Sequence, residues 1–194
     1  MAERISRTSH GDAPLSAAKN PNPAALRDAG VSAEKGDELV GRTVSINRPR
    51  GELYEFWRDF RNLPLFMENI ESVAVSDGRR SHWKVRAPAG QDVEWDALLT
   101  EDRTGEVIAW ESAEGADVRN SGRIEFRDST NDRGTMVTAT ITYDAPGGAV
   151  GKVIAKLFQR EPNIQARRDL RRFKQLMETG EVSTAMPPDA APRA

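Results

Sequence analysis

The chain of 194 residues has no cysteine and only two histidines. The absence of cysteine excludes disulfides, thiolate catalysis and cysteine zinc sites, and it is compatible with a reducing cytoplasm. His10 and His82 have no partner at the H-x-x-x-H or H-E-x-x-H spacing of a zinc site, and nothing in the sequence places a nucleophile beside His82. We therefore expect no metal site, no cofactor and no catalytic triad.

Long apolar runs and a large net charge are also missing. No stretch approaches the roughly 20 apolar residues that span a bilayer, and residues 1–20 lack the apolar core of a signal peptide. The formal net charge of −2 provides no overall field that would favour nucleic acid or a membrane surface. We expect a cytoplasmic protein without a nucleic-acid partner.

Large apolar side chains are scarce at both ends of the chain. Residues 1–38 and 181–194 consist mainly of proline, small and charged residues, so they bury too little surface to offset the entropy of ordering. We predict two disordered tails around a single domain of residues 39–180, which is long enough to form a substantial core.

The domain opens with a strand-like alternation of apolar residues over 40–46. A helix is predicted next, with Asn47 as its N-cap and Pro49 in its first turn. Its apolar face combines residues at spacings of three and four, namely Leu53, Phe56, Trp57 and Phe60. Residues 62–64, Asn-Leu-Pro, should break this helix, and one further helical turn is expected over 65–67.

The middle of the chain alternates apolar and polar residues with a period of two. The predicted strands are Ile70–Val75, His82–Arg86, Val93–Thr100, Val107–Ser112, Arg119–Phe126 and Thr135–Tyr143. Short connections between them favour an antiparallel meander, of about seven strands with the opening one. The period then changes to about 3.6 between Val150 and Met177, which predicts a long final helix with a kink or break at Pro162 and a stop at Gly180. This is an α+β architecture.

The inward residues of the predicted strands form one broad apolar face. A twisted sheet of about seven strands is some 30 Å across, whereas a helix is only roughly 10 Å wide. One long helix and a short helical pair cannot cover that face unless the sheet curls tightly. Either large side chains or a ligand must fill the remaining space. Small inward residues, such as Ala97, Ser112 and Ala139, favour some space.

The order of these elements and several motifs resemble a known superfamily. The motifs are Asp59–Pro64 (DFRNLP), Trp83–Pro88 (WKVRAP), Val93–Ala97 (VEWDA), Ile108–Trp110 (IAW) and Gly134–Val137 (GTMV). Over residues 40–178 the chain is similar to START-like (Bet v 1-like, SRPBCC) proteins with the helix-grip fold. It looks most like the bacterial polyketide cyclase/dehydrase group, which also holds the coenzyme Q-binding START proteins.

This resemblance implies a curved antiparallel sheet around a long C-terminal helix, with two short helices after the first strand. It also implies a hydrophobic ligand, lipid, quinone or polyketide-like, held between sheet and helix. The predicted cavity residues are Phe60, Phe66, Trp83, Val85, Trp95, Ala97, Leu99, Trp110, Ser112, Ile124, Phe126, Ala139, Ile141, Tyr143, Ile154 and Phe158. No catalytic residue of the family carries over by position.

Three functions stay open at this point. The first is a non-enzymatic carrier or sensor of a small hydrophobic ligand. The second is a cyclase or dehydrase, for which Tyr143 or Arg119 would supply the acid or base. The third is an interaction module whose apolar face is entirely core, which is the usual role of apolar stripes. Tyr54, Tyr143 and Arg119 are the polar side chains expected at the edge of a cavity.

The sequence gives less support to two other kinds of functional site, a phosphate-binding loop and a pair of catalytic carboxylates. The segment 147–153 (GGAVGKV) is similar to a phosphate-binding loop, but Pro146 takes the place of its first glycine and Val153 that of its Ser/Thr. Glu94 and Asp96 lie on one strand face about 7 Å apart, a separation compatible with paired carboxylates. They alternate with inward residues, however, so we expect them to face outward and to pair with Lys84 or Arg86.

The last helix is rich in positive charge. Its basic residues are Arg160, Arg167, Arg168, Arg171, Arg172 and Lys174. A solvated face is the usual role of such a run. The alternative is a weak contact with an anionic membrane surface or an acidic partner, worth about 1 kcal/mol per well-placed charge.

Overall fold

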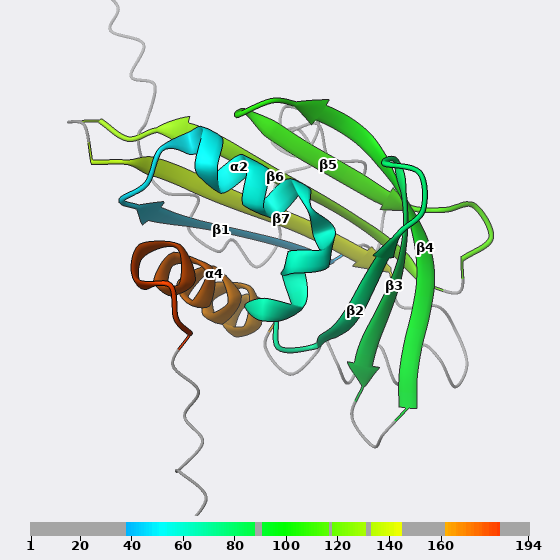
Figure 1. Cartoon of the computed structure of the whole chain (residues 1–194). Coiled ribbons are helices and arrows are strands. Elements are labelled where there is room, and N and C mark those ends of the chain that lie inside the picture. The colour runs from blue at the N-terminus through cyan, green and yellow to red at the C-terminus, as the bar shows by residue number, and fades with distance from the viewer. Residues whose placement is uncertain (1–37, 88–90, 117, 131–132, 145–161, 183–194) are drawn as a thin grey trace, which may run out of the picture.

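The computed structural model describes residues 38–87, 91–116, 118–130, 133–144 and 162–182. Its strands form one seven-stranded antiparallel sheet in the order β1-β7-β6-β5-β4-β3-β2. Their bounds are β1 Glu38–Ile46, β2 Ile70–Val75, β3 Arg80–Ala87, β4 Gln91–Arg103, β5 Val107–Ser112, β6 Arg119–Asp128 and β7 Thr135–Asp144. The predicted meander of strands is therefore confirmed, and the sheet curls so that β2 to β4 run across the direction of β1 and β7 (Figure 1).

Three helical segments lie on the concave side of the sheet (Figure 1). They are α2 (Arg50–Arg58), the 3-10 helix η1 (Phe60–Leu65) and α4 (Pro162–Thr179). α2 packs over β5 and β6, whereas α4 packs along β1. The helix-grip architecture is confirmed. The inner face is covered by helices from both ends of the domain sequence, because α2 and η1 follow β1 and α4 is the last element.

α2 begins later than predicted. Its first residue is Arg50, and the extended residue before it is Pro49. Asn47 makes no cap, because the turn after β1 points towards the end of α4 instead. There the backbone N–H of Asn47 donates to Oε1 of Glu178 at 2.7 Å, and Nε of Arg48 donates to the carbonyl of Met177 at the same distance.

The chain also leaves α2 earlier than predicted. Asp59 ends the helix, and its carboxylate accepts the backbone N–H of Arg61 at the start of η1. Phe60 therefore belongs to η1, and Pro64 lies inside η1 rather than in a break. Proline is tolerated there because the flanking turn bonds are donated by Asn62 and Phe66.

β4 runs further than predicted and contains a β-bulge. The register with β5 shifts between Leu99 and Glu101, so the strict alternation of inward and outward residues is interrupted. Beyond the bulge, Asp102 lies opposite Ile108, which is an inward residue. A carboxylate therefore reaches the concave side at a place where the period of two predicts an outward residue.

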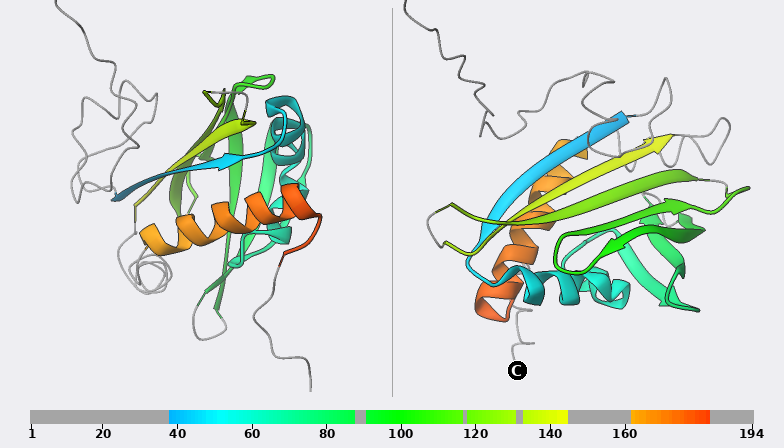
Figure 2. Two further views of the ribbon diagram at one scale, coloured as in Figure 1. Left: turned by 90° about the vertical axis from the view of Figure 1, so that its left-hand side faces the viewer. Right: turned by 90° about the horizontal axis from the view of Figure 1, so that it is seen from above.

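α4 runs in the same direction as β1, since Lys174 contacts Ser45 and Glu178 contacts Asn47, and both views in Figure 2 show the two elements alongside each other. Gly180 follows the helix with φ +79°, and its N–H donates to the carbonyl of Leu176 at 2.8 Å, so the predicted stop is confirmed. The described helix starts at Pro162, where a kink or break was predicted. The preceding part of the predicted helix, 150–161, lies outside the described residues. So do the predicted tails, except that Glu38 already belongs to β1 and residues 181–182 follow α4.

Candidate ligand-binding site

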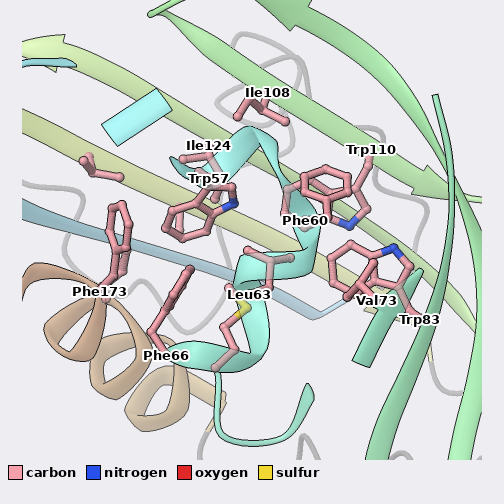
Figure 3. Packing of buried hydrophobic residues seen from close by; sticks show 14 of the residues in the cluster. Trp57, Phe60, Leu63, Phe66, Val73, Trp83, Ile108, Trp110, Ile124 and Phe173 are labelled. Atoms are coloured by element: carbon pink, nitrogen blue, oxygen red, sulfur yellow. The ribbon is translucent and has the colours of Figure 1, made fainter. Parts of the chain in front are cut away.

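One end of the concave face is closed by aromatic packing. Phe173 of α4 is fully buried, with its ring centroid 4.8 Å from that of Trp57 and 4.9 Å from that of Phe66. Leu63 of η1 is fully buried in the same cluster, and Figure 3 shows these side chains meeting between α4 and the sheet. This cluster joins α4 to α2 and η1.

Three tryptophans line the inner face of β3, β4 and β5. Trp83 stacks between Trp95 and Trp110, with centroid distances of 6.1 and 5.7 Å and interplanar angles of 15° and 21°. The ring of Phe60 meets Trp83 and Trp110 edge-on at 5.5 and 5.6 Å (Figure 3). The structure therefore makes these predicted cavity residues a buried aromatic wall. Their role in binding stays a prediction.

The position of Trp110 depends on β6. Trp110 lies opposite Gly122, and a Cβ on that glycine would be 2.2 Å from Cζ2 of the indole. The indole N–H of Trp110 donates to Oδ1 of Asn120 at 3.2 Å, and the backbone N–H of Asn120 donates to Oγ of Ser112 at 3.1 Å. Gly122 thus provides the space for the indole, and Asn120 fixes its orientation. The sequence analysis assigned Ile124 and Phe126 of this strand to the inner face but did not assign Gly122 or Asn120.

The burial of the inward side chains decreases from one end to the other of four neighbouring strands. At one end of β1, β7, β6 and β5 the inward residues are almost fully buried: Ile46, Val137, Phe126 and Ile108. At the other end the inward residues are only half-buried: Arg42, Ile141, Asn120 and Ser112. The strand register places Ile141, Asn120 and Ser112 in neighbouring rows at one end of the sheet, and Arg42, opposite Ala139, lies one inward position closer to the buried end. We call these four residues the open end.

One indole of the aromatic wall has an unused hydrogen-bond donor. The N–H of Trp83 donates to Oγ of Ser81 at 2.8 Å. The N–H of Trp95 is buried, yet it has no hydrogen-bond partner within the described part of the chain, and the same holds for Trp57. Trp95 precedes by two residues the position on β4 that lies opposite Ser112, so it borders the open end. Buried donors normally have partners, but this N–H lacks one that the described residues could supply.

Asp102 is an exposed residue that makes a polar contact with α2, and the sequence analysis missed it because the bulge in β4 turns its carboxylate towards the concave side. The hydroxyl of Tyr54 donates to Oδ1 of Asp102, and Nε of Arg58 donates to Oδ2 at 2.7 Å. Burial raises the pKa of Tyr54, and the hydrogen bond to Asp102 raises it further. Tyr54 was expected at a cavity edge, but it is 4% exposed and packs edge-on against Phe126 at the closed end.

The remaining predicted cavity residues divide into three groups. The buried ones, besides Phe60, Phe66 and the tryptophans, are Val85, Ala97, Leu99, Ile124, Phe126 and Ala139. Ser112 and Ile141 are half-buried at the open end. Ile154, Phe158 and the side chain of Tyr143 lie outside what the structure describes.

The expectation that Arg119 lies at the cavity edge is wrong. Asn120 of β6 faces inward, and neighbouring residues of a strand point to opposite faces, so Arg119 faces outward. Its side chain is exposed. This removes one of the two acid–base candidates for a cyclase.

The outer face of the sheet carries paired charges. Glu94 and Asp96 face outward as predicted, but they contact His82, and Asp96 also pairs with Arg80, rather than with Lys84 or Arg86. Nδ1 of His82 lies 2.8 Å from Oδ1 of Asp96, and Nε2 lies 3.4 Å from Oε2 of Glu94. The hydrogen bond to Asp96 raises the pKa of His82. A separate shallow hollow of about 340 Å³, between the α2–η1 corner and the end of β2, is lined by Glu55, Arg58, Asp59, Arg61 and Val75.

A polar cluster joins α4 to the loop between η1 and β2. The carboxylate of Asp169 accepts Nε2 of Gln165 at 2.8 Å and the backbone N–H of Glu68. The carboxylate of Glu68 pairs with Arg172 at 3.4 Å and with Arg168 at 3.6 Å. Burial raises the pKa of Asp169 to about 7, although its hydrogen bonds and Arg172 oppose this.

Solved structures of other proteins share this architecture. A protein from Deinococcus radiodurans is 42% identical, with a TM-score of 0.61 over 74% of this chain and 99% of its own. A protein from Thermus thermophilus is 23% identical, with a TM-score of 0.55 over 71% and 95% of the two chains. The Zhui aromatase/cyclase from a Streptomyces species is 16% identical, with a TM-score of 0.56 over 76% and 99%. The last two likenesses show the fold alone.

Comparison with curated proteins finds no match. In the described ranges, no helix has both the length and the apolar character needed to cross a membrane. A family model, described as polyketide cyclase / dehydrase and lipid transport, matches residues 46–171, which is more than half of the chain. The chain therefore belongs to the polyketide cyclase / dehydrase and lipid transport family.

Proposed function

We propose that this protein binds or carries a small hydrophobic molecule against the aromatic wall, at the open end of the concave face. The observation that carries this proposal is the fall in burial from Val137 to Ile141 on β7 and in parallel along its neighbours. A face that served only as core would be covered to both ends. The family also supports the proposal, because its description includes lipid transport.

Binding would depend mainly on removing apolar surface from water, at roughly 25 cal/mol per Å². The wall formed by Trp83, Trp95 and Trp110 offers flat apolar area, and rings or chains of a lipid, quinone or polyketide-like ligand would pack on it. The unused N–H of Trp95 would orient the ligand by donating to one of its oxygen atoms. A cytoplasmic location, as expected from the sequence, stays a prediction.

The polar groups of the open end favour binding over catalysis. Arg42, Ser112 and Asn120 supply hydrogen bonds, but none of these residue types is a usual general acid or base in enzymes. Asp102, on the same concave side, is engaged by Tyr54 and Arg58. A polyketide cyclase is the second candidate, since the family description names this activity, and it requires an acid or base that contacts the substrate.

A matched pair of variants on β7 tests the proposal. Ile141→Trp adds an indole to the open end, whereas Thr138→Trp adds the same group to the outer face of the same strand. Delipidated protein is titrated with dodecanoate, a short-chain ubiquinone and an anthraquinone while tryptophan emission is recorded. We expect at least one probe to bind, and Ile141→Trp to weaken it about tenfold or more with Thr138→Trp unchanged. Binding that neither variant affects would contradict the proposed site.

A further inference from the structure

Arg42 is a cation on the apolar side of the sheet. It lies opposite Ala139, which is buried on the concave face, and its neighbours Gly41 and Thr43 face the other side. The Arg42 side chain is half-buried. Nη1 donates to the backbone carbonyl of Gly41 at 2.8 Å, and four of the five guanidinium N–H groups remain after this bond.

Arg42 differs from the other basic residues of the described chain whose side chains are at least half-buried. Each of the others has a carboxylate within ion-pair distance: Arg48, Arg58, Lys84, Arg123, Arg172 and Lys174. Among the Asp and Glu residues whose side chains the structure describes, none lies within ion-pair distance of the Arg42 guanidinium. Charged groups that are partly removed from water normally have a counter-charge nearby. The Arg42 guanidinium therefore needs an anion from outside the described carboxylates.

α4 adds positive charge along the same edge. Nζ of Lys174 donates to the carbonyl of Ser45 on β1 at 2.6 Å. Arg171 and Arg167 lie on the same helix face, three and seven residues earlier, and α4 runs in the same direction as β1 (Figure 2). This face therefore continues from Ser45 towards the part of β1 that holds Arg42. Both arginines are exposed, and they would attract an approaching anion.

We infer that Arg42 binds the anionic group, a carboxylate or a phosphate, of an amphipathic ligand whose apolar part occupies the open end. This inference rests on the proposed function and narrows the ligand class. A guanidinium can hold either group through two parallel N–H bonds, which are the stronger, charge-assisted kind. The competing role for Arg42 is to shield the edge of β1 through Gly41, as Lys174 does at Ser45.

The test compares probes that share one alkyl chain. Dodecanoate, dodecyl phosphate and the neutral dodecan-1-ol are titrated calorimetrically into the delipidated full-length protein, into Arg42→Gln, and into Arg127→Gln as a control on the outer face. Glutamine can still donate to the carbonyl of Gly41, so the edge contact is retained. Arg42→Lys keeps the positive charge but lacks the planar guanidinium group that can donate two parallel hydrogen bonds. The dodecan-1-ol affinity reports whether each variant keeps an intact apolar site.

We expect the wild type and Arg127→Gln to bind at least one anionic probe about tenfold or more tighter than dodecan-1-ol. In Arg42→Gln this preference should disappear while dodecan-1-ol binds as before, and Arg42→Lys should restore part of it. The carboxylate and phosphate arms show which anion is preferred. A preference that survives in Arg42→Gln, or a wild type without one, overturns the inference. If only the ubiquinone or the anthraquinone binds, the inference is wrong and the proposed function stands; if nothing binds, both fail.

Discussion

Trp110 and Gly122 share one space on the inner face of the sheet. The indole on β5 lies where a side chain on β6 would stand, since a Cβ at residue 122 would be 2.2 Å from Cζ2 of Trp110. Real Cβ atoms do not approach another carbon so closely, so any larger residue must displace the indole. Trp110 stacks on Trp83, so this glycine determines the geometry of the whole aromatic wall.

Gly122→Ala should therefore destabilise the protein by about 1–3 kcal/mol, the usual cost of overpacking. It should also change the near-ultraviolet circular dichroism of the stacked indoles. Gly41→Ala is the matched control, because a Cβ there meets nothing within 4 Å and the residue also lies in a strand. Urea unfolding of the two variants gives the comparison. Equal stability of the two would show that the indole moves at no cost.

Phe173 should be the main anchor of α4. Its ring is fully buried against Trp57, Phe66 and Phe56, so Phe173→Ala should cost about 3–5 kcal/mol in the free energy of unfolding. Arg171→Ala, an exposed change on the same helix, should cost less than about 0.5 kcal/mol. Similar losses for both variants, measured by urea unfolding, would mean that α4 is held by charge rather than by aromatic packing.

Asp169 should make stability depend on pH. Its pKa is raised to about 7 in the folded protein from an ordinary value of 3.8, so the folded state binds more protons than the unfolded state between these values. Stability should then fall as pH rises through this window. Asp169→Asn keeps an acceptor for Gln165 and for the Glu68 N–H, and should be more stable than the wild type at pH 8 by roughly 1–3 kcal/mol. The difference should shrink towards pH 4. Urea unfolding that gives the same difference in unfolding free energy between the two proteins at pH 4 and at pH 8 would refute this.

The indole N–H of Trp95 should report ligand oxygen directly. The chain has four tryptophans, so its nitrogen-15 spectrum has four indole signals, and Trp95→Phe assigns one by its loss. Benzophenone and diphenylmethane differ only by a carbonyl in place of a methylene. We expect benzophenone to move the Trp95 proton downfield, as hydrogen bonding does, and diphenylmethane to leave it nearly unchanged. Equal shifts with the two compounds would show that Trp95 contributes surface only.

The sequence predicts the strands well because one side of the sheet is buried, and the period of two survives wherever the strands are regular. β2 and β5 match the predicted ranges to the residue. Asp102 could not be predicted, because the bulge in β4 reverses the alternation and no local signal announces it. The later start of α2 follows from Asn47 bonding to Glu178, a contact between residues 131 positions apart.

The candidate site was predictable in part. The tryptophans were assigned to the inner face from alternation alone, and the structure buries them there. Arg42 was predicted only as a member of the first strand, but its importance depends on having no carboxylate beside it among the described side chains, which only the three-dimensional arrangement reveals. Arg119 was misplaced because the alternation of β6 was not extended back through Gly122 and Asn120.

The central claim is that the open end holds a hydrophobic guest. Its most direct test is to purify the protein under native conditions, denature it, extract it with organic solvent and identify the extract by mass spectrometry, with Ile141→Trp treated in parallel. The account predicts a lipid, quinone or aromatic compound in near-stoichiometric amount from the wild type and much less from the variant. An empty wild-type extract, from a protein that also binds none of the probes when they are added back, would contradict it.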